Sequence, residues 1–156
     1  MEVYEIYDKF ESDIENGVIS DVCIEEIRRY LLGVMRSDVS DARMLLSRLY
    51  RYLLKYRYQQ ENQAILWIEM IRMASIDLAI ILEEKRLRDK LTVDIQQELY
   101  LHVAKGLLVE MNMTENIFVK NIPDEFRLEN IMDYGAIHDY LRKYAYCKHI
   151  KDELNI

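Results

Sequence analysis

The chain has few residues that break regular structure, since its 156 residues include only one proline and four glycines. An antiparallel β-sandwich or barrel needs many tight turns, which those two residue types usually supply. Their scarcity therefore favours long helices joined by short turns. We expect an all-α fold in which residues 1–156 form a single domain.

Cysteine and histidine are also scarce. Cys23 and Cys147 are too few and too far apart for a disulfide framework, and single histidines stand at 102, 138 and 149. A zinc site needs several Cys, His or carboxylate ligands at close spacing, so we expect no metal and no cofactor. The first residues lack the basic start and apolar middle of a secretory signal, which leads us to expect a cytoplasmic protein.

Positive charge is in deficit. Lys and Arg number 21 against 28 Asp and Glu, which gives a formal net charge of -7. That balance opposes a generally nucleic-acid-binding surface, although a local basic stripe can persist on an acidic protein. Apolar residues make up 51% of the chain, more than a disordered segment contains, so we expect a folded core.

The longest apolar run spans residues 64–82, where fifteen of nineteen residues are apolar. Its spacing predicts a helix, and a helix that is apolar almost all round must be enclosed by other helices, a partner chain or lipid. Glu69, Arg72 and Asp77 would make lipid too costly, so we expect no membrane partner. We predict a helical bundle of about six to seven helices around this buried central helix.

Apolar residues at helical intervals predict the other helices. An amphipathic helix is expected over residues 3–14 and a last helix over residues 137–147, while residues 117–119 are expected to form a plug over the core. Gly33 and Gly106 are expected at close helix crossings. The expected helix caps are Ser20 or Asp21, Ser37 or Ser40, Thr92 and Asp124.

A basic, tyrosine-rich helix is predicted over residues 43–58, which contain no acidic residue. The candidate contacts to an anionic ligand are Arg48, Arg51, Lys55 and Arg57. Cations would bind phosphates and tyrosines would stack on bases, so a nucleic-acid-associated protein is one alternative function. The other interpretation is that the tyrosines pack at the edge of the core and the cations pair with acidic residues elsewhere in the chain.

Arg142 and His149 are seven residues apart, which would place them on the same face of one helix. The spacing is similar to that of the helical ribonuclease domains called HEPN. That resemblance implies a His acting as general acid or base and an Arg stabilising phosphate charge. A HEPN-like ribonuclease is therefore a second alternative. Apart from this pair we expect no catalytic residue, and we expect the chain not to be an enzyme.

Several short elements occur in a fixed order along the chain. They are Ile24-Glu25-Glu26-Ile27, Leu53-Leu54-Lys55-Tyr56, Tyr58-Gln59, Trp67, Tyr100, Phe118, Pro123 and residues 128–133. Their order resembles the bacterial domain-of-unknown-function 29 family over residues 19–137 and leaves residues 138–156 as a C-terminal helical extension. The departures are Tyr52, Tyr56, Gln60 and Ser75, where His, Trp, Pro and Arg are usual. The resemblance implies an all-α fold whose biochemical role is not established.

Excess apolar surface on the 64–82 helix supports the leading hypothesis about function. Met70, Met73 and Ile80 extend the apolar cover beyond one face of this helix, and they are the candidate interface residues. The chain also has eight methionines and twelve tyrosines, residue types that suit interfaces. We expect a non-enzymatic protein–protein interaction domain that acts as a homodimer or within a complex.

Overall fold

The computed structural model describes residues 6, 9–10, 12–13, 16, 21–112 and 120–156. Within these residues it contains six α-helices, two short 3-10 helices and no strand, so the all-α class is confirmed for the described chain. Most of the helix predicted over residues 3–14, and the plug predicted over residues 117–119, lie outside the described residues. None of the helices in the described part is long and apolar enough to cross a membrane.

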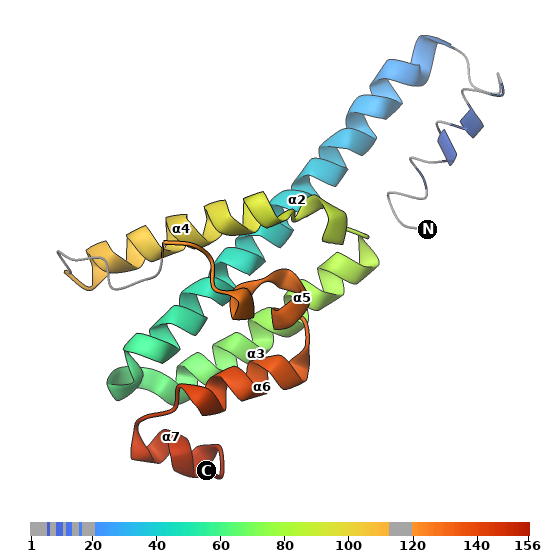
Figure 1. Ribbon diagram of the computed structural model, residues 1–156. Coiled ribbons are helices and arrows are strands. Elements are labelled where there is room, and N and C mark those ends of the chain that lie inside the picture. Colours follow the sequence, from blue (N-terminus) through green and yellow to red (C-terminus); the bar gives the residue numbers. More distant parts are fainter. Residues whose placement is uncertain (1–5, 7–8, 11, 14–15, 17–20, 113–119) are drawn as a thin grey trace.

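The longest element is helix α2, Asp21–Tyr58, with 38 residues. The sequence predicted two helices here with a new cap at Ser37 or Ser40, and that prediction is wrong. The segment contains no proline, and an apolar stripe from Ala42 through Leu46, Leu49 and Leu53 continues the helix as buried core. An ideal helix of this length is about 57 Å long. The N-terminal half of α2 consequently projects beyond the other described helices (Figure 1).

The two glycines that were expected at helix crossings do not lie at close contacts. Among the residues that the structure describes, no atom lies within 4 Å of a Cβ atom added at Gly33 or at Gly106. Both residues are exposed, Gly33 in the projecting part of α2 and Gly106 in helix α4, Val93–Glu110. The prediction of close approach at these positions is therefore wrong.

Helix α3, Gln60–Glu84, follows α2 after a single residue and packs back along it as an antiparallel neighbour (Figure 1). Helix α4 crosses α2, and the predicted Thr92 cap at its start is confirmed because the hydroxyl accepts a 3.3 Å hydrogen bond from the Ile95 amide. The 3-10 helix η1, Arg88–Lys90, lies between α3 and α4. Helices α2, α3 and α4 form the framework of the molecule.

The chain after residue 120 consists of short helices that cover one side of this framework. They are η2, Asp124–Phe126, α5, Leu128–Ile131, α6, Tyr134–Lys143, and α7, Lys148–Glu153. The predicted cap at Asp124 is wrong, because Asp124 lies inside η2, which has no side-chain cap. Asp133 is a cap instead, since its carboxylate accepts a 2.9 Å hydrogen bond from the Gly135 amide at the start of α6.

An aromatic cluster fills the core between α2, α4 and the C-terminal helices. Tyr50 stacks on Phe126 with ring centroids 5.6 Å apart, and Tyr100 meets both rings edge-on. The hydroxyl of Tyr140 donates a 2.8 Å hydrogen bond to the Leu53 carbonyl, and that of Tyr56 donates to the Leu141 carbonyl. These two bonds attach α6 to the C-terminal half of α2.

The predicted enclosure of the central helix is not confirmed within the single chain. One face of α3 is buried against the other helices, through Ile68, Ile71, Ala74, Leu78 and Leu82. Large apolar residues on the remaining surface of α3 are exposed to solvent. Within the described residues, the helix that was expected to be covered all round is therefore covered on one side.

Candidate protein-interaction surface

The uncovered surface of α3 carries five large apolar side chains, which we call the outer α3 face. Their exposed fractions are 44% for Ile65, 43% for Leu66, 58% for Met73, 55% for Ile76 and 48% for Ile80. Single exposed apolar residues are normal on protein surfaces, but contiguous ones mark binding sites. Five on one helix face therefore make this surface the strongest candidate functional site.

The positions of these residues follow a regular spacing. Leu66, Met73 and Ile80 are seven residues apart, and Glu69, Ile76 and Glu83 fall between or after them to give steps of three and four. All six positions are exposed. Four of the six are apolar, and the steps of three and four are those of the a and d positions in a coiled-coil seam, so the outer α3 face has the spacing of a helix that packs along a second helix.

The sequence-predicted interface residues lie at or beside this seam. Met73 and Ile80 are exposed seam residues, whereas Met70 is half-buried at its border. Sequence reasoning missed Leu66 and Ile76 as interface residues. The seven-residue interval between Leu66, Met73 and Ile80 was visible in the sequence and could have identified Leu66, and Ile76 follows Met73 by the three residues that place it on the same face.

Two charged side chains flank the seam. Arg72 lies directly before Met73, and Asp77 lies directly after Ile76. Arg72 is half-buried and Asp77 is exposed. Neither residue has an ion-pair partner among the side chains that the structure describes. Both charges consequently remain available to a group outside the described chain.

The basic helix segment is arranged differently, because several of its cations contact groups within the fold. Glu110 at the end of α4 accepts hydrogen bonds from Arg51 at 2.6 Å and from Lys55 at 3.1 Å. The hydrogen bond from Lys55, together with the bond and charge of Arg51, holds the pKa of Glu110 below its usual value. The Lys55 ammonium also lies 4.8 Å from the centre of the Trp67 ring. Both cations therefore have a partner within the chain, although the single carboxylate of Glu110 balances only one of the two positive charges.

The other two candidate anion contacts, Arg48 and Arg57, lie in different surroundings from this pair and from each other. The Arg57 guanidinium stacks over the Tyr144 ring at 4.2 Å, and Arg48 is exposed. The tyrosines of the segment face inward: Tyr50 is fully buried, and Tyr52 stacks on Trp67 with centroids 5.9 Å apart. For the tyrosines, and for Arg51, Lys55 and Arg57, this arrangement matches the interpretation in which the tyrosines pack at the core and the cations contact groups in the same chain.

Arg142 and His149 do not share a helix. Arg142 lies in α6, which ends at Lys143, and His149 lies in α7, which begins at Lys148. Residues 144–147 turn between the two helices, and both side chains are exposed. The prediction of one continuous helix over residues 137–147 is wrong, and with it the reason for placing these two side chains on a common face.

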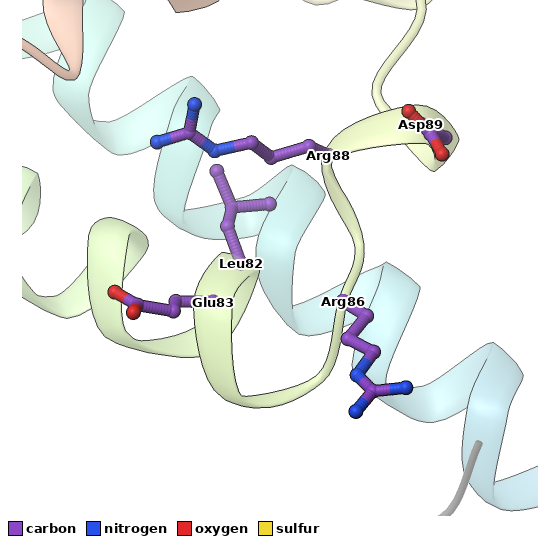
Figure 2. Close-up of a pocket in the computed structure, with 5 residues that line it drawn as sticks. All are labelled: Leu82, Glu83, Arg86, Arg88 and Asp89. Atoms are coloured by element: carbon purple, nitrogen blue, oxygen red, sulfur yellow. The ribbon is translucent and has the colours of Figure 1, made fainter. Parts of the chain in front are cut away.

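A surface pocket of about 470 Å³ lies where α3 ends, lined by Leu82, Glu83, Arg86, Arg88 and Asp89. Figure 2 shows that the two arginine side chains extend in different directions and that Asp89 points away from both. The charges are mixed and do not converge on one point, so they form no evident ligand site. The described residues also contain no group of three or more His, Cys, Asp or Glu that could hold a metal ion.

The comparisons with known proteins identify a family but no characterised relative. The model of the family described as "Domain of unknown function DUF29" matches residues 8–135. This match confirms the resemblance noted in the sequence and ends near the start of α6, so most of α6 and all of α7 lie beyond it. Neither a curated protein nor a solved structure gives a significant match to the chain.

Proposed function

Because this chain belongs to the family described as domain of unknown function DUF29, whose description assigns no activity, we propose a function from its geometry. The chain is a non-enzymatic protein-interaction domain, and its binding surface is the outer α3 face. The single observation that carries this proposal is the row of exposed apolar side chains at Leu66, Met73, Ile76 and Ile80. The domain acts in the cytoplasm, where a free cysteine such as Cys147 stays reduced.

A partner on the outer α3 face would bury several apolar side chains. Full burial of one Leu, Ile or Met side chain contributes roughly 1.5–3 kcal/mol, and several such side chains lie in one row on α3. A helix has no free backbone groups along its side, so its partner must offer apolar side chains rather than a strand edge. A partner on this face would also enclose α3 on all sides, which completes the bundle that the sequence predicted around this helix.

The alternative functions have less support from the described residues. Nucleic-acid binding would need free cations, but Arg51 and Lys55 are paired with Glu110 on a protein of net charge -7. A ribonuclease would need Arg142 and His149 to act together, and they lie on separate helices. The outer α3 face, by contrast, is an apolar surface that no group among the described residues covers.

A matched pair of substitutions tests the proposal. Ile76→Asp places a charge in the outer α3 face, and Val109→Asp places one on α4, where Val109 is 78% exposed. The wild type and each variant are produced separately, at native level, in the organism from which the protein comes. Each lysate is then fractionated by size. We expect wild type and Val109→Asp to elute above the monomer mass of 18.8 kDa, and Ile76→Asp to elute as a monomer.

Two results would overturn the proposal. One is a wild-type protein that elutes as a monomer from the lysate. The other is an Ile76→Asp variant that keeps the elution volume of the wild type. Circular dichroism of the purified variants checks that both are folded, which we expect because Ile76 and Val109 are exposed and contribute little to the core.

A further inference from the structure

The spacing and charges of the outer α3 face indicate which partner it binds, an inference that rests on the proposed function above. Taking Leu66, Met73 and Ile80 as a positions makes Glu69, Ile76 and Glu83 d positions. The buried side of α3 then falls on the b, c and f positions, which in a coiled coil point away from the partner. One helix thus presents two separate apolar faces, of which the chain itself covers one.

We propose that the outer α3 face pairs with the same face of a second copy of this chain, with the two α3 helices parallel and in register. Leu66, Met73, Ile76 and Ile80 then each meet their own copy along about 21 Å of helix. The arrangement has a two-fold axis parallel to the helices, so it closes as a dimer and does not extend into a filament.

The charges that flank the seam select the parallel orientation. In a parallel pair, a g residue of one helix faces the e residue of the next heptad in the partner, five positions further along. Arg72 is at g, and Asp77, at e, is five positions further on. Arg72 of each copy therefore faces Asp77 of the other, which forms two equivalent ion pairs. The g-to-e pair one heptad earlier joins Ile65 to Met70 and is apolar.

An antiparallel pair would make none of these ion pairs. There, g positions face g positions and e positions face e positions. The g residues Ile65, Arg72 and Ala79 include no acid, and the e residues Met70, Asp77 and Glu84 include no base. Antiparallel packing would leave Arg72 without an acidic partner and could bring Asp77 near Glu84, which like-charge repulsion disfavours. Charge complementarity thus favours two parallel copies.

The seam also contains a feature that limits its strength. Glu69 and Glu83 occupy d positions, and each would lie near its own copy in the dimer. Two carboxylates at close range repel each other, and a polar seam residue specifies register at a cost in stability. The dimer is therefore reversible, with its apolar contact concentrated between Met73 and Ile80.

A charge-exchange experiment on the purified full-length chain tests this inference. In Arg72→Asp both flanking charges are negative, and in Asp77→Arg both are positive, so each variant alone has two repulsive pairs per dimer. An equimolar mixture restores two attractive pairs in the heterodimer. We expect each variant alone to bind itself about tenfold or more weakly than wild type, and the mixture to return to within about threefold of it.

The readout is the molar mass from light scattering over a concentration series. Wild type is expected to rise from 18.8 kDa towards twice that value, 37.6 kDa. Arg142→Asp and Asp139→Arg make the same charge changes at exposed positions of α6 and are expected to behave like wild type. Thermal unfolding of each variant checks that it is folded.

Three results would overturn the inference: a wild-type chain that stays monomeric at its highest soluble concentration, single variants that dimerise as wild type does, or a mixture no better than its components. Its failure is distinguishable from failure of the proposed function. A purified monomer that still forms an Ile76-dependent complex in lysate excludes a second copy and supports another protein as the partner. Absence of that complex as well overturns both proposals.

Discussion

Replacing Leu78 by alanine is expected to lower the free energy of unfolding by about 3 kcal/mol, within the range observed for buried leucines. Leu78 is fully buried on the covered side of α3, so the substitution removes apolar contacts and leaves a cavity. Met73 lies five residues earlier on the same helix but is 58% exposed on the outer α3 face. Met73→Ala is expected to change the free energy by less than about 0.5 kcal/mol.

Denaturant unfolding of both variants at low protein concentration measures this contrast, because dilution keeps any self-association out of the measured stability. Comparing the two alanine variants removes any effect of helix ends, since both residues lie well inside the same helix. Similar losses at Leu78 and Met73 would mean that both sides of α3 are packed within one chain. The outer face would then not be a free surface.

Replacing Gln60 by alanine is expected to have the second large effect, a loss of about 3 kcal/mol or more. The buried Gln60 side chain donates a 2.6 Å hydrogen bond to the Tyr144 carbonyl. Its carbonyl oxygen accepts bonds from the Tyr146 amide at 2.9 Å and the Cys147 amide at 3.2 Å. The alanine variant leaves three backbone groups without these partners, and each such group costs about 1–3 kcal/mol if it stays buried.

The neighbouring residue provides the control, since Gln59 makes no side-chain capping bond and is only half-buried. Gln59→Ala is expected to be nearly as stable as wild type. Amide hydrogen exchange gives a second readout, because loss of the Gln60 side chain should speed exchange at Tyr146 and Cys147 before global unfolding. Equal stability of the Gln59 and Gln60 variants would show that Gln60 does not hold the turn between α6 and α7.

The presence of helices could be predicted from apolar periodicity, but the residues at which they begin and end could not always be predicted. Residues 37–41 contain Ser37, Asp38, Ser40 and Asp41, which resemble a helix start. Ser37, Ser40 and Asp41 are exposed and Asp38 is half-buried. Such residues are tolerated inside a helix when they face solvent, and no proline interrupts them. The local preference of these residues for a helix start was therefore overridden, because packing of the continuous apolar stripe stabilises α2 as one helix.

The surroundings of α3 were the least predictable part of the candidate site. An apolar helix surface has the same composition whether it faces its own chain or a partner, so the run over residues 64–82 could not distinguish the two. The pairing of Arg51 with Glu110 joins residues 59 positions apart, which no local pattern reveals. Gln60 was recognisable as a departure from the family pattern, but its partners at residues 144–147 became visible only in the fold.

Photo-cross-linking at the outer α3 face shows most directly whether that face contacts another protein. A photoreactive amino acid in place of Met73 is compared with the same group in place of Val109, in the protein's own cells. We predict that irradiation gives a discrete product of higher mass for position 73 and none for position 109. Products that are absent at position 73, or equally abundant at both positions, would contradict a contact at this face.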